Sequence, residues 1–250
     1  MRVVSQILVL FIGACAVPFM SETDMEIASE EQFEQMKQTM PLSTDAGLNS
    51  YIHCVARAII AELEPPYDSK DWEVVIFEDE SINAFAMAGG KIGVFTGILT
   101  VAENQDQLGA VLGHEVAHVT QQHALERTNR AMTTQAGVVG ASAVLGGGQG
   151  TYELLSMGAQ LGLTLPYGRG QESEADVVGL DYMADAGFDP RASVQLWKNM
   201  ADANKGAPPE FMSTHPSSDT RISELIEQFP AALARYNAAK AEGKQPNCRR

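Results

Sequence analysis

Apolar residues recur with a helical spacing in some segments of this chain and with a strand-like pattern in others. Between residues 48 and 63 they return every three or four positions, as on one face of a helix, and the pattern ends before Pro65-Pro66. The next segment, residues 72–77, reads Trp-Glu-Val-Val-Ile-Phe, and its β-branched and aromatic residues predict a strand. A helix followed by a strand therefore begins the folded part of the chain.

Two further short apolar segments, residues 84–87 and 91–96, flank Gly89-Gly90. This arrangement predicts a β-hairpin, because consecutive glycines supply the positive φ angles that a tight turn requires. Together with the strand at residues 72–77, the hairpin predicts a small antiparallel sheet.

The second half of the chain has a helical pattern. Residues 104–128 form a long stretch without proline, which predicts one helix with Asn104 as its N-cap. Further helices are predicted at residues 171–186, 190–204 and 221–229. Helices that follow a small sheet predict an α+β fold, mostly helical, with the helices packed against one side of the sheet.

Residues 131–165 interrupt this pattern. They are rich in Ala, Gly and Ser and contain Gly146-Gly147-Gly148, and their uninterrupted apolar runs are too short for a membrane span. We expect a closely packed helix and a mobile loop here; a lid over a functional site is the alternative.

The amino terminus has the composition of an export signal. Residues 3–16 are almost wholly apolar, and they are too few to span a membrane comfortably. The Ile-Gly-Ala-Cys sequence that ends at Cys15 resembles the bacterial lipobox, in which the signal is cut before the cysteine and that cysteine carries lipid. We therefore expect lipidation of Cys15; the alternative is an ordinary signal peptide cleaved near Ala14 or Ala16.

These features divide the chain into four parts. We expect a signal peptide at residues 1–14 and a lipid-anchored tether at 15–48, with a short helix near 30–37. A folded domain is expected at residues 49–238, followed by a C-terminal tail at 239–250.

Charge and cysteine content limit the classes of partner and leave one cross-link open. The formal net charge is −15, so the phosphates of nucleic acid would be repelled and a basic surface for anionic lipid is not expected. We therefore predict no nucleic-acid partner and attachment to a membrane by the lipid anchor alone. Cys54 and Cys248 could form a disulfide that ties the tail to the start of the domain, or remain as two thiols.

The sequence His-Glu-Val-Ala-His at residues 114–118 lies within the predicted long helix. Residues four apart share one helix face, so His114 and His118 can direct their imidazoles at one metal ion. Glu115 lies next to that face, where it can accept a proton from a water molecule that zinc activates and return it to the leaving amine. The motif predicts zinc-dependent hydrolysis of peptide bonds.

Two histidines leave such a site incomplete, because catalytic zinc takes three protein ligands and keeps one open position. A third histidine ten residues after the first is absent from the sequence, and His123 is one position off and expected at the surface. Later in the chain, Glu172 and Asp176 are four residues apart and share a helix face, whereas Glu174 points elsewhere. One of these two carboxylates can bind zinc while the other orients a ligand histidine through its ring N–H.

Together these motifs resemble a known family. The His-Glu-Val-Ala-His sequence, the Arg-Gly-Gln-Glu-Ser-Glu-Ala-Asp sequence at 169–176, Thr-His-Pro at 214–216 and Asn-Ala-Phe-Ala-Met at 83–87 are similar to those of the CAAX prenyl protease and HtpX group of zinc metalloproteases. The resemblance extends over about residues 51–229 and is greatest to a branch of soluble periplasmic lipoproteins. It implies a zincin-like fold with a glutamate ligand, that is, a gluzincin.

The resemblance also implies the roles of single residues. It implies one Zn²⁺ ion per chain on His114, His118 and Glu172, with Glu115 as the catalytic acid and base. His215 of the His-Pro motif is implied to lie near the metal, where it either stabilises the oxyanion or caps the zinc in a resting state.

Further residues are implied to lie around the ligands. Asp176 is implied to support the zinc ligands without binding the metal itself, and Arg221 is expected to pair with Asp176. An edge strand is expected to bind extended substrate backbone to backbone through Asn83, Ala84, Phe85 and Ala86.

The leading functional hypothesis is an exported zinc metalloendopeptidase that degrades misfolded or unassembled proteins of the bacterial cell envelope. It would act on the periplasmic side, anchored to the outer membrane as a lipoprotein. The alternative is a chaperone-like or scaffold lipoprotein whose zinc site is largely capped by His215. The sequence predicts neither the physiological substrate nor the oligomeric state.

Overall fold

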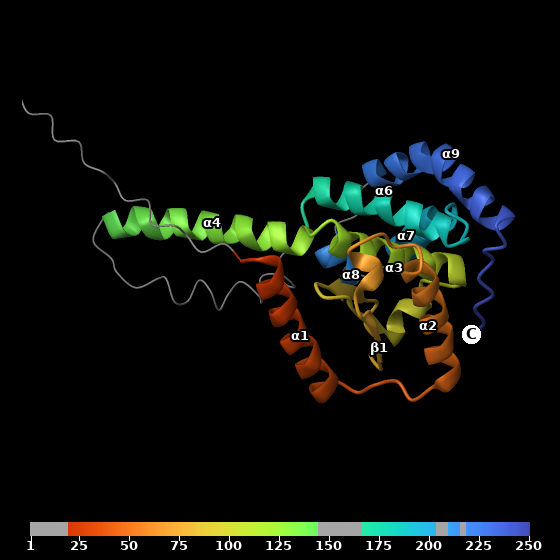
Figure 1. Ribbon diagram of the computed structural model, residues 1–250, viewed down its shortest axis with the longest axis horizontal. Helices are drawn as coiled ribbons and strands as arrows, with labels where there is room; N and C mark the ends of the chain where they lie inside the picture. The colour runs from red at the N-terminus through yellow and green to blue at the C-terminus, as the bar shows by residue number, and fades with distance from the viewer. Residues whose placement is uncertain (1–19, 145–166, 204–209, 216–218) are drawn as a thin grey trace, which may run out of the picture.

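The computed structural model of the chain describes residues 20–144, 167–203, 210–215 and 219–250 (Figure 1). Its helices are α1 (Glu22–Thr39), α2 (Ala46–Ile60), α3 (Gln105–Thr120), α4 (His123–Val144), α6 (Arg169–Asp185), α7 (Ala192–Asp202), α8 (Glu210–Thr214) and α9 (Asp219–Ala241). Its strands are β1 (Glu73–Phe77), β2 (Ala84–Met87) and β3 (Lys91–Phe95). The described fold is therefore mostly helical with a small sheet, as the sequence predicts.

The sheet has the strand order β1-β3-β2. Strands β2 and β3 form the predicted antiparallel hairpin, and Gly89 and Gly90 in its turn both have a φ of 80°. Strand β1, however, pairs with β3 in parallel, so the sheet is mixed rather than wholly antiparallel. The chain leaving β1 crosses to the far edge before the hairpin begins, and the returning strand β3 then lies in the middle with the direction of β1.

Side chains alternate between the two faces of this sheet, as the strand period of two requires. One face packs with α2 and α3 in the main core through Ile76, Ala84, Ala86, Ile92 and Val94. The other face carries a smaller aromatic cluster with Phe77, Phe85, Met87 and Phe95. Both faces are therefore covered, whereas the sequence predicted helices on one side.

Helix α1 covers the second face. Its N-cap is Ser21, whose hydroxyl accepts a hydrogen bond from the backbone N–H of Asp24 at 3.1 Å. Three buried residues four positions apart, Met25, Ser29 and Phe33, form one stripe along it. The short helix expected near residues 30–37 is thus longer, and the segment expected to be a tether lies against the sheet over its helical length.

The predicted helix at residues 104–128 is two helices. Asn104 is its N-cap, as predicted, and accepts hydrogen bonds from the backbone N–H groups of Asp106 and Gln107. The chain breaks between α3 and α4 at Gln122, which has a left-handed φ of 54°. Glutamine gives no sequence signal for such a break, because this conformation is uncommon for residues with a side chain. Figure 1 shows α4 extending away from the other elements.

Helix α6 lies between α3 and α9, and α3 and α6 cross in close contact (Figure 1). A Cβ atom at Gly113 of α3 would lie 2.6 Å from the carbonyl oxygen of Gly179 of α6. A Cβ at Gly179 would in turn lie 2.7 Å from the backbone nitrogen of His114. Both glycines are required because the two backbones touch at this crossing.

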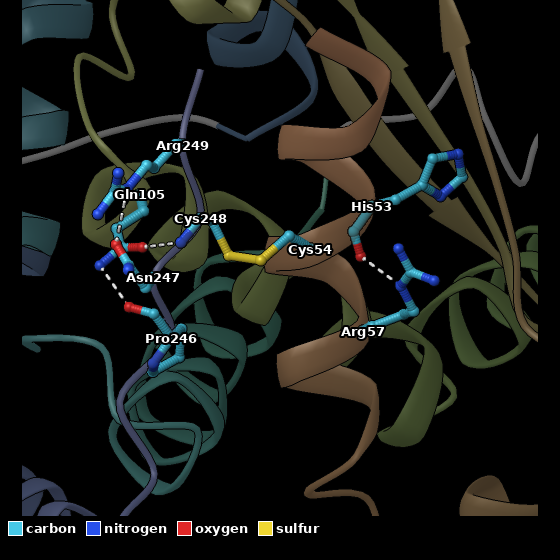
Figure 2. Close-up of a disulfide and its surroundings, with 8 residues drawn as sticks. All are labelled: His53, Cys54, Arg57, Gln105, Pro246, Asn247, Cys248 and Arg249. Atoms are coloured by element: carbon cyan, nitrogen blue, oxygen red, sulfur yellow. Dashed lines mark hydrogen bonds between the residues drawn. A yellow bond between two sulfur atoms is a disulfide. The ribbon is translucent and has the colours of Figure 1, made fainter. Parts of the chain in front are cut away.

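The carboxyl-terminal segment is fastened to the domain. Helix α9 runs through Pro230 to Ala241, beyond the predicted end at Phe229. A disulfide then joins Cys248 to Cys54 of α2, and the backbone N–H of Cys248 donates to Gln105 Oε1 at 2.9 Å (Figure 2). A disulfide that closes so long a loop stabilises a fold by about 2–5 kcal/mol. The cross-link that the sequence left open is therefore part of the structure.

Several predicted features lie outside the described residues. They are the signal peptide at 1–14, the lipidation candidate Cys15 and the glycine-rich loop at 146–148. Along the described ranges, none of the helices combines the length and the apolar content that crossing a membrane requires.

We predict that Gly179→Ala destabilises the protein by about 1–3 kcal/mol, because its Cβ would force α3 and α6 apart. Gly170→Ala on the same helix is the matched control, since a Cβ there has no atom within 4 Å. The control is expected to be neutral or slightly stabilising, because alanine favours helix more than glycine. Urea unfolding of both variants measures the difference, and equal stabilities would contradict the close crossing.

Candidate metal centre

Three elements bring four potential metal ligands together in the interior. Helix α3 supplies His114 and His118, α6 supplies Glu172, and His215 directly follows α8. None of the four side chains is appreciably exposed, and one donor atom from each lies within 4.8 Å of the others. The two histidines share one helix face, as their spacing of four requires.

The donor atoms surround one position. His114 Nε2 lies 3.1 Å from His118 Nε2 and 3.2 Å from His215 Nδ1. The Glu172 carboxylate lies 3.0 Å from His215 Nδ1, 3.5 Å from His118 Nε2 and 3.6 Å from His114 Nε2. Ligands of a tetrahedral zinc ion, each about 2.0–2.1 Å from the metal, are about 3.3 Å apart. The donor types and their separations therefore fit one zinc ion.

Glu115 lies beside this donor set and is held by a hydrogen bond at one of its oxygens. Its Oε2 accepts a hydrogen bond of 3.2 Å from the backbone N–H of Ala86 in β2, and its Oε1 lies 3.3 Å from His215 Nε2. Burial raises the pKa of this carboxyl, although the charges of His215 and His114 act in the opposite direction. His215 therefore faces the donors with one ring nitrogen and Glu115 with the other.

A buried ion pair supports the ligands from behind. Arg221 of α9 binds Asp176 through Nε at 2.6 Å and Nη2 at 2.8 Å, which is the pairing that the sequence led us to expect. Its Nη1 also lies 2.5 Å from Glu172 Oε2, a contact that was not foreseen. Burial would raise the pKa of Asp176, but hydrogen bonds from Arg221 and His114 outweigh it and lower the pKa. Asp176 Oδ1 lies 3.1 Å from His114 Nδ1, so it can orient that imidazole.

The protonation of the donors follows from this surrounding charge. Burial alone would lower the pKa of His114, but hydrogen bonds to Asp176 and Glu172 and their charges raise it to about 9. Burial would raise the pKa of Glu172, but contacts with His114 and His215 lower it. Burial and the positive charge of His114 hold the pKa of His118 well below its usual range. The two motif histidines thus differ in protonation state near neutral pH.

The prediction that His123 is a surface residue is wrong. His123 is only 2% exposed, and its Nδ1 lies 2.9 Å from His118 Nδ1. Glu174, which was expected to point away from the face of Glu172 and Asp176, has an exposed side chain and lies 3.1 Å from His123 Nε2. The error has one physical cause. The prediction assumed a continuous helix, whereas the break at Gln122 changes the direction of the chain before His123.

Sequence reasoning also missed Tyr167, which packs on His118, and Arg127, which packs on Tyr167. The ring of Tyr167 stacks on the His118 imidazole at 3.8 Å between centroids and 23° between planes. The Arg127 guanidinium lies 3.8 Å from the Tyr167 ring centroid. Neither residue belongs to a spacing pattern, and the only available signal was the nearness of Tyr167 to the motif that contains Glu172.

Strand β2 forms the edge of the sheet beside these residues. Its register with β3 turns the backbone groups of Phe85 toward β3 and those of Ala84 and Ala86 away from it. A cavity of about 150 Å³ lies along this edge and is bordered by Asn83, Ala84, Phe85, Ala86, Glu115, Arg127, Tyr167 and His215. A second, much smaller cavity of about 20 Å³ continues past Ala86, and its lining is mainly apolar, with Met25, Val119 and Leu125 among its residues.

Comparison with known proteins agrees with this geometry. Residues 47–228 match the sequence model of peptidase family M48, and this range contains all four donors. The mitochondrial metalloendopeptidase OMA1 of Schizosaccharomyces pombe is 40% identical over 186 residues, which are 73% of this chain and 53% of that protein. The beta-barrel assembly-enhancing protease of Yersinia pestis is 32% identical over 216 residues, 80% of this chain and 43% of that protein.

A human protein named metalloendopeptidase OMA1, mitochondrial, is also similar, with 32% identity over 228 residues, 83% of this chain and 42% of that protein. The chain therefore spans about half the length of the curated relatives it matches. Its placement near the CAAX prenyl protease and HtpX group, and in a lipoprotein branch, stays a prediction.

We predict that zinc binding at pH 7 releases about one proton. With a pKa of about 9, His114 is protonated before binding and must lose its Nε2 proton to act as a ligand, whereas His118 and Glu172 are already deprotonated. Calorimetric titration with zinc in buffers of different ionisation enthalpy counts the protons. Asp176→Asn removes a charge that raises this pKa and is expected to release fewer; native protein that releases none would contradict the prediction.

Proposed function

The chain belongs to peptidase family M48, and from that premise we propose that it is a zinc-dependent metalloendopeptidase. The observation that carries the proposal is the buried donor set with Glu115 directly beside it. Four donor atoms about 3.0–3.6 Å apart suit one tetrahedral ion, and a carboxylate outside the set suits a proton carrier. A purely structural zinc site would have no use for such a carboxylate.

In this proposal His114, His118 and Glu172 hold the zinc. Bound zinc supplies a Lewis acid that polarises the substrate carbonyl and lowers the pKa of water. Asp176 orients His114, and Arg221 binds both Asp176 and Glu172, so the charges of the carboxylates are balanced. The ligands are therefore held in place before any metal arrives, which suits tight binding.

Glu115 carries the proton between the two steps of hydrolysis. It accepts the proton of the attacking water and then gives it to the leaving amine. Its buried position raises its pKa, which makes it better able to hold that proton for the second transfer. The hydrogen bond from Ala86 fixes Oε2, so Oε1 faces His215 Nε2.

The substrate would bind as an extended strand along β2. The outward-facing backbone groups of Ala84 and the carbonyl group of Ala86 can pair with it, as in β-strand addition; the N–H of Ala86 already donates to Glu115. The two cavities continue this edge in both directions from Ala86, and the apolar lining of the smaller one favours an apolar substrate side chain. Unfolded polypeptide offers both an extended backbone and exposed apolar residues, which supports misfolded proteins as substrates.

His215 would restrain the enzyme in this arrangement. Its Nδ1 lies 3.2 Å from His114 Nε2 and 3.0 Å from the Glu172 carboxylate, so it would compete with substrate and water for a bound zinc ion. This observation favours capping over stabilisation of the oxyanion. It is also consistent with the alternative, a chaperone-like or scaffold protein whose zinc site stays closed.

We also propose that the protein acts in the bacterial cell envelope, on the periplasmic side, and is anchored to the outer membrane by lipid on Cys15. The lipobox-like sequence supports the anchor. Relatives in Yersinia pestis and Vibrio cholerae that bear the name beta-barrel assembly-enhancing protease support a role with envelope proteins that fail to assemble.

We predict that Glu115→Gln reduces cleavage of unfolded casein by at least about 100-fold, because the proton carrier is lost. Zinc content, measured by metal analysis, is expected to stay at one ion per chain. Glu210→Gln is the matched control, since Glu210 borders the same cavity and is exposed. Zinc-loaded native protein without Glu115-dependent cleavage of any unfolded substrate would favour the scaffold alternative.

We predict that His215→Ala raises kcat/KM for casein by about tenfold, which corresponds to a native site that is open about a tenth of the time. The steady-state rate of the zinc-loaded variant measures this change. A lower rate would instead assign His215 to the oxyanion, and an unchanged rate would remove it from the site.

A further inference from the structure

We propose that His123 and Glu174 form a hydrogen-bond relay that fixes the ring orientation and tautomer of the ligand His118. His118 Nδ1 lies 2.9 Å from His123 Nδ1, and His123 Nε2 lies 3.1 Å from Glu174 Oε2. His123 is a positioning residue in this relay, since its contact is with the back of a ligand. The inference rests on the proposed function, because it needs His118 to bind the metal.

The direction of the hydrogen bonds follows from the ligand. His118 Nε2 faces His114 Nε2 at 3.1 Å and the Glu172 carboxylate at 3.5 Å, so this nitrogen must be the one that binds the metal. A neutral imidazole that binds through Nε2 carries its proton on Nδ1. His118 Nδ1–H therefore donates to His123 Nδ1, which must be unprotonated to accept.

The same logic fixes the second hydrogen bond. A neutral His123 that accepts at Nδ1 carries its own proton on Nε2, and this N–H donates to the Glu174 carboxylate. Glu174 has an exposed side chain, with 56% of its area accessible. The relay therefore leads from the buried donor set to a carboxyl group at the surface.

The break between α3 and α4 makes the relay possible. Residues five apart on a continuous helix point about 140° away from one another, so His123 could not face His118. The left-handed Gln122 turns the chain and brings the His123 ring back. Gln171, the neighbour of Glu172, then fixes this turn, because its side-chain amide donates to the backbone oxygen of His123 at 3.3 Å.

The two motif histidines are thus supported in different ways. His114 Nδ1 lies directly against the carboxylate of Asp176, which itself binds Arg221. His118 reaches its carboxylate through a second imidazole. Partners behind a ligand histidine raise its basicity and typically contribute 10–100-fold in metal affinity.

Substitutions at His123 and Glu174 can test the relay without unfolding the protein. The His118 ring is also held by the stacked ring of Tyr167, so loss of one hydrogen bond need not unfold the site. Glu174 is exposed, and its substitution leaves the core unchanged. Variants at both positions can therefore test the relay in the intact chain.

The test is the zinc dissociation constant, measured by competition with a chromophoric chelator. His123→Phe keeps a ring but cannot accept a hydrogen bond, and we expect its zinc dissociation constant to rise about 10–100-fold. His123→Asn places an acceptor oxygen near the Nδ1 position and is expected to recover most of the loss. The absorption spectrum of the Co²⁺-loaded protein is expected to shift in His123→Phe and to return toward native in His123→Asn.

Variants of Glu174, at the exposed end of the relay, provide a second test. Glu174→Ala is expected to weaken zinc binding, and Glu174→Gln, which still accepts from His123, is expected to bind as the native protein does. Glu227→Ala removes an exposed helical carboxylate from α9 and is the matched control, with no expected change. Thermal unfolding of the metal-free proteins measures any purely structural effect.

The outcomes separate this inference from the proposed function. Native protein that binds zinc while His123→Phe and Glu174→Ala bind it equally well would overturn the relay alone. A fall in thermal stability without a change in zinc affinity or in the Co²⁺ spectrum would also overturn it. Native protein that binds no zinc would overturn the proposed function, and the relay with it.

Discussion

The backbone contact between Gly113 and Gly179 is the constraint on which the centre depends. Metal sites need donors fixed to within a few tenths of an ångström, and here the donors come from helices far apart in the sequence. Because neither glycine has a side chain, α3 and α6 approach until their backbones touch, one residue before His114. Glu172 and Asp176 lie on the same helix as Gly179, so this crossing sets their distance from the motif histidines.

The close crossing also decides the electrostatics of the site. Three carboxylates, several imidazoles and Arg221 lie together in the interior, and such a set is stable only if its charges compensate. Arg221 bridges Asp176 and Glu172, and this leaves the inner faces of the histidines and the glutamate for a cation. The negative charges of Asp176 and Glu172 raise the pKa of His114 to about 9. The site therefore favours positive charge, which a proton on His114 supplies in part and a metal ion would supply in full.

The sequence predicted the elements that depend on local pattern. Periodicity indicated the helices and the hairpin, and the spacing in 114–118 placed two imidazoles on one face. What it could not predict depends on contacts between distant segments. The parallel pairing of β1, the stripe of Met25 and Phe33 under the sheet, and the turn at Gln122 carry no local signal. The misjudged position of His123 follows from that one turn.

The disulfide between Cys54 and Cys248 has a topological consequence for a peptidase. It closes a covalent ring across 194 positions of sequence, and the sheet, α3, α6 and α9 all lie within it. The proposed peptidase is itself a polypeptide, so one copy can cleave another. One cut inside the ring only opens it, so both pieces remain a single molecule and all the donors stay together. A fragment is released only by a second cut or by reduction.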